Sequence, residues 1–167
     1  MEGQFSHLDD LGKLRMVDIS AKRSTRRTAM ARCLVVTSAQ LGELEARDDE
    51  IDPALCARIT GVSAAKRTSD LIPLCHSLNL NDVNIDLDQR ERGVEVTATV
   101  TATQRTGVEM EALTACAFAG LSIVNSLASE DPNAWIDELV LLRKEGGKSG
   151  NWGRLVEGSG TKPSKEG

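Results

Sequence analysis

The stretch from Ala112 to Ser129 most constrains the fold, because its eighteen residues include no charged side chain. Glu109 and Glu111 stand directly before it, where carboxylates favour the positive end of a helix dipole. The apolar residues cover more than one face of the predicted helix, which indicates burial on several sides. Scattered serine, threonine and asparagine residues argue against a membrane span, since each would need a hydrogen-bond partner in lipid. The sequence therefore predicts a helix that packs closely on a sheet or on another subunit.

Alternating apolar and polar residues predict strands on both sides of this helix. Residues 81–88 and 93–103 alternate with period two around a short polar turn, which favours a hairpin. Residues 134–142 alternate in the same way after the helix. Strands interleaved with helices predict an α+β fold, an antiparallel sheet covered by helices on one face.

The N-terminal half contains further local signals. Asp52 followed by Pro53 is typical of a helix cap and a first-turn proline, and residues 47–52 before them form an acidic loop. The other predicted elements are a strand at 16–20, a basic turn at 21–27, a stretch at 28–38 that is β-rich at its end, a short helix from a Ser38 cap to about Ala46, and a helix from Pro53 to near Ser69.

Composition limits the core and the partners. Two Phe, two Trp and no Tyr among 167 residues leave the core to aliphatic side chains and provide no stacking platform for single-stranded nucleic acid. A net charge of −5 argues against general affinity for nucleic acid or acidic membranes. The acidic N-terminus has no apolar leader region, which indicates a cytoplasmic protein. We expect an N-terminal arm at 1–14, one domain at 15–157 and a disordered tail at 158–167.

The cysteines form no recognisable metal or redox motif. Their spacing fits neither a zinc ribbon nor a thioredoxin pair, so we expect buried free thiols, no metal and no cofactor. Cys75 and His76 are adjacent on a predicted extended segment, which would point them to opposite faces and prevent proton transfer between them. The chain has two histidines, His7 and His76, and four cysteines, Cys33, Cys56, Cys75 and Cys116.

The sequence EGGKSG at 145–150 ends like a phosphate-binding loop. Leu142 stands where that motif requires its first glycine, and no apolar helix start follows, so the stretch is not a Walker motif. It is a backbone-rich turn accompanied by Arg143, Lys144 and Lys148. Such a turn either binds phosphate or merely ends a strand.

Four segments together resemble one enzyme family. They are SHLDDLGKLRMVDIS, AAKRTSDLIPLCHSL, RTGVEMEALTA and KEGGKSG, within about residues 6–150. They resemble the molybdenum cofactor biosynthesis protein C (MoaC) family, the cyclic pyranopterin monophosphate synthases. The resemblance implies a ferredoxin-like subunit, a homo-oligomer that is a hexamer built from dimers, and an active site at a subunit interface. It also implies conversion of 3′,8-cyclo-7,8-dihydroguanosine triphosphate to cyclic pyranopterin monophosphate, with release of pyrophosphate.

The resemblance also assigns roles to residues of this chain. A guanine-like ring offers amide and amine donors that a carboxylate accepts, and a triphosphate requires cations. The implied substrate-binding residues are Leu74, Cys75, His76, Glu109, Met110, Glu111 and Lys66. The implied triphosphate-binding residues are Lys22, Arg27, Lys144 and Lys148.

Three positions depart from the family pattern. The resemblance places a catalytic lysine where this chain has Glu50, an aspartate where it has Asn125, and a second lysine where it has Ala128. Neither an amide nor a methyl group transfers a proton at neutral pH, and a glutamate repels a triphosphate. The sequence therefore predicts a retained pocket and impaired chemistry.

Three functions remain compatible with the sequence. In the first, the chain is a catalytically silent paralogue that binds the nucleotide or joins a mixed hexamer. In the second, it is an active synthase whose acid and base have moved, with Glu50 and His76 as candidates. In the third, it is a structural or regulatory subunit. The retained Glu-Met-Glu motif and His76 argue against the third, because a scaffold does not need them. A second, intact copy in the genome would favour the first over the second.

Overall fold

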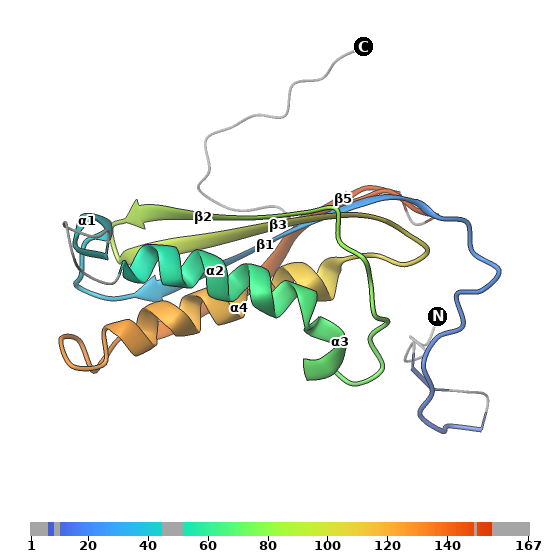
Figure 1. Cartoon of the computed structure of the whole chain (residues 1–167), viewed down its shortest axis with the longest axis horizontal. Coiled ribbons are helices and arrows are strands. Elements are labelled where there is room, and N and C mark those ends of the chain that lie inside the picture. The colour runs from blue at the N-terminus through green and yellow to red at the C-terminus, as the bar shows by residue number, and fades with distance from the viewer. Residues whose placement is uncertain (1–6, 9–10, 45–51, 149, 155–167) are drawn as a thin grey trace, which may run out of the picture.

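The computed structural model describes residues 7–8, 11–44, 52–148 and 150–154, in which helices cover one face of a five-stranded antiparallel sheet (Figure 1). The strand order is β2-β3-β1-β4-β5. The elements are β1 (Thr25–Val36), α1 (Leu41–Leu44), α2 (Pro53–Lys66), α3 (Thr68–Leu71), β2 (Asp82–Arg90), β3 (Gly93–Gln104), α4 (Glu109–Ser126), β4 (Trp135–Glu145) and β5 (Trp152–Gly153). The succession β1-α2-β2-β3-α4-β4 is the ferredoxin-like arrangement, so the predicted α+β fold is confirmed.

The two central strands carry the core on the face beneath the helices. β1 and β3 pair antiparallel over their whole lengths, with Ala31 opposite Ala98 and Cys33 opposite Val96. Side chains alternate along a strand, so one set faces the helices while the other faces away. The buried set is Ala29, Ala31, Cys33 and Val35 on β1, and Val94, Val96, Ala98, Val100 and Ala102 on β3.

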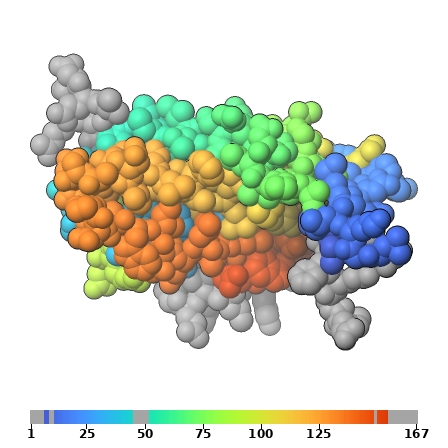
Figure 2. Space-filling model, turned by 90° about the horizontal axis from the view of Figure 1, so that it is seen from below, coloured from blue at the N-terminus to red at the C-terminus, as the bar shows by residue number. Residues whose placement is uncertain are grey.

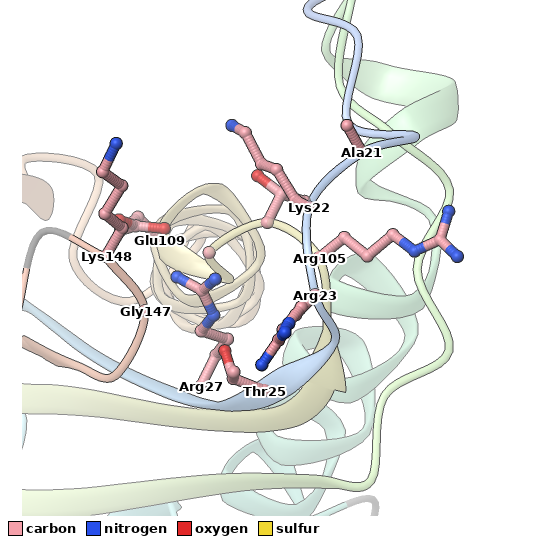
Figure 3. Close-up of a pocket in the computed structure, with 11 residues that line it drawn as sticks. Ala21, Lys22, Arg23, Thr25, Arg27, Arg105, Glu109, Gly147 and Lys148 are labelled. Atoms are coloured by element: carbon pink, nitrogen blue, oxygen red, sulfur yellow. The ribbon is translucent and has the colours of Figure 1, made fainter.

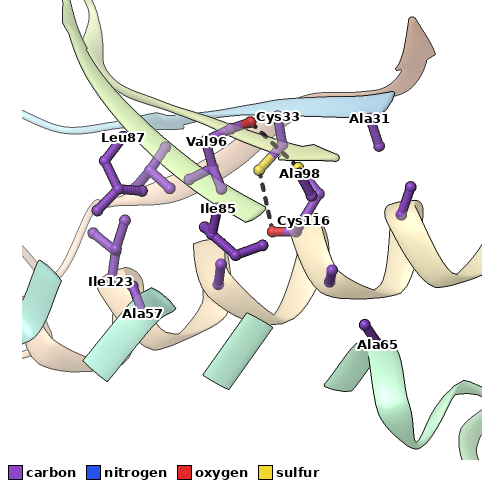
Figure 4. Packing of buried hydrophobic residues seen from close by; sticks show 14 of the residues in the cluster. Ala31, Cys33, Ala57, Ala65, Ile85, Leu87, Val96, Ala98, Cys116 and Ile123 are labelled. Carbon is purple, nitrogen blue, oxygen red and sulfur yellow. Dashed lines mark hydrogen bonds between the residues drawn. The ribbon is translucent and has the colours of Figure 1, made fainter. Parts of the chain in front are cut away.

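Small residues let α2 and α4 approach each other and the sheet closely (Figure 4). A Cβ added at Gly61 on α2 would lie 3.0 Å from the carbonyl oxygen of Ala115 on α4. A Cβ added at Gly120 would lie 3.1 Å from the sulfur of Cys33 on β1. The side of α4 that faces the sheet and α2 is therefore buried, as its composition predicts, whereas Phe118 and Leu121 stay at least one-third exposed. The result is a thin, aliphatic core without a buried aromatic ring among the described residues.

The hairpin, the last long strand, α2 and α4 lie where the sequence predicts them. The Asp52 cap is also confirmed, because its carboxylate accepts a hydrogen bond from the Leu55 backbone N–H at 2.8 Å. The helix predicted to end near Ser69 instead ends at Lys66, and α3 follows after one residue. The predicted tail and the acidic loop at 47–51 lie outside the described residues.

Two local predictions in the N-terminal half are wrong. Residues 16–20 form no strand, because the Asp18 carboxylate accepts the Ser20 backbone N–H at 2.8 Å in a side-chain turn that competes with extended pairing. The strand β1 instead begins at Thr25, inside the predicted basic turn. Ser38 does not cap α1, since its backbone N–H and hydroxyl both donate to Asp131.

Among the described residues, none of the helices combines the length and the hydropathy that a bilayer crossing requires.

Candidate functional site

Two adjoining cavities surround the N-terminus of α4. The larger has a volume of about 880 Å³ and the smaller about 300 Å³. They share Lys22, Thr106, Gly107 and Glu109 in their walls, and we refer to the two adjoining cavities together as the cleft. We call the larger one the basic cavity, after Lys22, Arg23, Arg27, Arg105 and Lys148 in its wall. We call the smaller one the histidine cavity, after His7 and His76 in its wall.

The basic cavity concentrates positive charge in a chain of net charge −5. Its wall contains five cationic side chains and one carboxylate, that of Glu109. Figure 3 looks along α4 and shows Lys22 and Arg27 beside the start of the helix, whereas Arg105 extends away from it. Aligned peptide dipoles add positive potential at a helix N-terminus. The cavity is therefore suited to a multiply charged anion.

The turn after β4 shapes one side of the basic cavity. Gly146 and Gly147 have φ values of 89° and 78°, which favour glycine. A Cβ at Gly147 would overlap the Arg27 guanidinium, so the turn holds that side chain closely. The Arg27 Nε is buried and has no hydrogen-bond partner among the described residues. The EGGKSG turn therefore both ends β4 and lines the cavity.

Lys144 lies beside the cleft in an ion pair. Its Nζ is 3.1 Å from an Oε1 of Glu109, and both side chains remain partly exposed. Partly exposed ion pairs contribute little to stability because water screens them. This pair therefore leaves Lys144 able to turn toward a phosphate when one is bound.

Glu111 gives the histidine cavity an unusual carboxyl group. Only 4% of the residue is exposed, although it lies in the first turn of α4. Burial raises the pKa of this carboxyl from 4.5 to about 7; its own backbone N–H lowers the pKa and the nearby Glu109 charge raises it further. The group therefore exists in both protonation states near neutral pH.

A strained turn brings Cys75 and His76 to the same cavity. Leu74 has a φ of 68°, a conformation that branched side chains rarely adopt, and the Cys75 backbone N–H donates to Ile72 at 3.3 Å. Cys75 and His76 both line the histidine cavity. The positive φ lies at Leu74, directly before Cys75, and the opposite orientation of the Cys75 and His76 side chains stays a prediction. Burial raises the pKa of the Cys75 thiol, and the Glu111 charge raises it further.

The structure brings together most of the residues that the resemblance assigns to substrate. The histidine cavity contains Leu74, Cys75, His76, Glu109, Met110 and Glu111. The basic cavity contains Lys22, Arg27 and Lys148, and Lys144 adjoins Arg27 and Glu109 in a small neighbouring hollow.

Three assigned residues lie away from this cleft. Lys66 is exposed at the end of α2 and is not part of either cavity wall. Asn125 lies fourteen residues after Glu111 on α4, which corresponds to about 21 Å along a helix, and Ala128 lies beyond the helix end. Glu50 falls outside the described residues.

Sequence reasoning did not assign His7, Arg23 or Arg105 to the site. Arg23 belongs to the basic run at 21–27, which we interpreted only as a turn. His7 stands within the SHLDDLGKLRMVDIS segment, but no spacing signal connects it with residues seventy positions away. Tertiary structure alone brings it to the cavity.

Comparison with known proteins identifies the relatives of this chain. The MoaC family model matches residues 16–147. The "Cyclic pyranopterin monophosphate synthase 2" of Mycobacterium tuberculosis (strain ATCC 25618 / H37Rv) is 47% identical over 154 residues, which cover 91% of this chain and 92% of that protein. The "Cyclic pyranopterin monophosphate synthase" of Streptomyces coelicolor is 45% identical over 156 residues, covering 92% and 91% respectively. That of Thermomicrobium roseum is 43% identical over 155 residues, covering 90% and 93%. With a family match that includes β1 to β4 and both long helices, and relatives of this similarity along nearly its full length, this chain belongs to the MoaC family.

Proposed function

We propose that this chain acts in molybdenum cofactor biosynthesis by binding 3′,8-cyclo-7,8-dihydroguanosine triphosphate, with impaired conversion to cyclic pyranopterin monophosphate. One observation supports this most directly. A cavity rich in cations adjoins a cavity with a buried carboxyl, and both open at the N-terminus of α4. A nucleoside triphosphate has the same division into a polyanion and a ring with polar edges.

The two ends of the ligand match the two cavities. Lys22, Arg27 and Lys148 offer charged donors to the phosphates. Glu111, when ionised, accepts hydrogen bonds from ring amide and amine groups. The apolar side chains of Leu74 and Met110 provide surfaces for the ring faces. This division of charge orients the nucleotide, with its phosphates in the basic cavity and its ring in the histidine cavity.

The impaired chemistry follows from the residues at the far end of α4. Asn125 and Ala128 stand where the family resemblance places an aspartate and a lysine, and neither transfers a proton. At about 21 Å from Glu111, Asn125 cannot reach a ligand in the same subunit's cleft. A complete site therefore requires the end of α4 from a second copy.

The outer faces of the helices support such an assembly. Several large apolar side chains on them are at least one-third exposed, and they lie at helical spacing on each helix. They are Leu55 and Ile59 on α2 and Phe118 and Leu121 on α4. Burying this surface against other copies would stabilise a homo-oligomer, and we propose the hexamer built from dimers that the family resemblance implies.

A second candidate is an active synthase with a relocated acid and base. The carboxyl of Glu111 favours it, because a group whose pKa is about 7 is well suited to general acid and base catalysis at neutral pH. His76 lines the same cavity and could exchange protons with a ligand there. The two candidates agree on the pocket and differ only in turnover.

Calorimetric titration with guanosine triphosphate tests the binding proposal. A charged hydrogen bond contributes about 1.5–3 kcal/mol, so Lys22→Ala and Arg27→Ala should each weaken binding roughly tenfold or more. The matched control is Arg92→Ala. Arg92 lies in the β2–β3 turn and pairs with Asp137 on β4, and neither residue lines the two cavities. Equal affinities for the parent chain, Lys22→Ala and Arg27→Ala would contradict the assignment of the basic cavity.

A Lys66→Ala variant adds information about assembly. The side chain of Lys66 lies outside the cleft of its own subunit. We expect weaker binding from this variant only if another copy brings Lys66 to the pocket. The same titration on an oligomer and on a dilute, dissociated sample separates the two cases.

A further inference from the structure

The geometry points to His7 as a further ligand-binding residue: its imidazole Nδ1 forms a hydrogen bond with the ring of the nucleotide in the histidine cavity. The inference rests on the proposed function, because it concerns the same pocket. His7 has no role in the family-based assignment of the site. Three features of the structure carry it: the position of His7, an unpartnered nitrogen, and the chemistry of the surrounding wall.

A short local contact holds His7 in place. The carbonyl oxygen of His7 accepts a hydrogen bond from the Arg15 backbone N–H at 2.9 Å, and Leu8 forms an antiparallel bridge with Leu14. These contacts fold the chain back on itself next to the cleft. Figure 2 shows this dark blue N-terminal segment lying against the green segment that follows α2. The position of His7 is therefore set by backbone contacts on both sides of the turn.

The imidazole has a buried nitrogen without a partner. The Nδ1 of His7 is inaccessible to solvent and has no hydrogen-bond partner among the described residues. Buried polar atoms in native proteins are nearly always hydrogen-bonded, so such an atom requires an explanation. Other atoms of His7 line the cavity, so a rotation of the imidazole on binding would bring Nδ1 to a bound molecule that supplies the missing partner.

The wall around His7 suits a flat heterocycle. Apolar side chains from three separate segments, Val17, Leu74 and Met110, offer contact surfaces for ring faces. Polar groups of His76 and Glu111 lie in the same wall and can reach ring edges. An imidazole Nδ1 donates or accepts according to its tautomer, and a guanine-derived ring presents both donors and acceptors. His7 thus adds a third polar contact, contributed by the N-terminal segment.

A ring contact and a phosphate contact predict different results with two probes. Guanosine triphosphate has both a ring and phosphates, whereas inorganic triphosphate has only phosphates. We expect His7→Phe to weaken binding of guanosine triphosphate about tenfold and to leave binding of inorganic triphosphate unchanged. Lys22→Ala should weaken binding of both probes. His7→Asn should recover most of the lost affinity, because its side-chain amide places a polar atom near the position of Nδ1.

Imidazole nitrogen NMR on the unmodified chain supplies a measurement without mutation. Only two histidines contribute signals, and the His7→Phe spectrum assigns them. We expect addition of guanosine triphosphate to shift the Nδ1 signal of His7. An unshifted His7 signal, or full affinity in His7→Phe, together with a loss in Lys22→Ala, would overturn the role of His7 and leave the pocket standing. An absence of any guanosine triphosphate binding by the parent chain would instead refute the proposed function.

Discussion

The buried carboxyl of Glu111 makes the stability of the chain depend on pH near neutrality. Its pKa in the folded chain is about 7, and its ordinary value is 4.5. Because the folded chain holds this proton more tightly, the added stability is complete below about pH 4.5 and is lost as the pH rises through about 7. The Asp18 and Asp131 carboxyls, whose pKa values are lowered, act only in a more acidic range.

The size of the effect follows from the two pKa values. Their separation corresponds to at most about 3.5 kcal/mol at about 1.4 kcal/mol per pH unit. Part of this free-energy change falls below about pH 5. We therefore expect the free energy of unfolding to decrease by about 2 kcal/mol between about pH 5 and about pH 8. For a chain of this length that decrease lowers the melting temperature by roughly 4–8 °C.

Glu111→Gln removes the titrating group while keeping its shape. At about pH 8 the melting temperature of the variant should exceed that of the parent by nearly the whole roughly 4–8 °C. At about pH 5 the two melting temperatures should agree closely. Thermal denaturation at a fixed protein concentration measures both points, since an assembly makes melting depend on concentration. Glu130→Gln, at an exposed position in the turn after α4, is the control and should keep the pH dependence of the parent. A Glu111→Gln variant whose melting temperature keeps the parent's pH dependence would refute the assignment of that dependence to Glu111.

Three further predictions concern packing, strain and assembly. Gly61→Ala should lower the melting temperature by several degrees, because its Cβ meets the Ala115 carbonyl, while Gly42→Ala, which has open space, should not. Leu74→Asn should raise the melting temperature slightly, since asparagine tolerates a φ of 68°; a decrease would mean that the leucine side chain contributes more than the strain costs. Light scattering at micromolar concentration should show a multimer, and a monomer would contradict the role of the exposed helix faces.

Elements with strong local periodicity were predictable from the sequence. The hairpin of β2 and β3 and the long helix α4 each repeat a clear pattern over many residues, and tertiary contacts reinforce that pattern. Residues 16–20 have enough apolar character to suggest a strand, but one side-chain hydrogen bond from Ser20 to Asp18 favours a turn. Ser38 shows the same limit, because its cap-like hydroxyl is engaged by Asp131 from a distant loop.

Part of the lining of the candidate site was predictable from the sequence, but its geometry was not. Motif resemblance identified Glu111 and His76, because their neighbours in the sequence carry the resemblance. It could not show that Leu74 adopts a left-handed backbone conformation directly before Cys75 and His76, which both line one cavity. Nor could it place His7 in the wall of that cavity, since this position depends on folding of the N-terminal segment.

The central claim is that the chain keeps the pocket and has lost the chemistry, and turnover tests it most directly. The assay supplies 3′,8-cyclo-7,8-dihydroguanosine triphosphate to purified chain and measures the pyranopterin product after oxidation to a fluorescent pterin. The triple variant Glu50→Lys, Asn125→Asp, Ala128→Lys restores the groups that the family resemblance implies. General acid and base groups contribute roughly 10²–10⁴-fold, so even imperfect placement should give a gain on the order of tenfold.

Single changes should do less than the triple variant. Asn125→Asp alone adds a carboxylate without its cationic neighbour, and Ala128→Lys alone adds an ammonium without the partner that orients it. We predict near-background turnover by the unmodified chain and a clear gain in the triple variant. Substantial turnover by the unmodified chain, free of host enzyme, would contradict the claim and favour a relocated acid and base at Glu111 or His76.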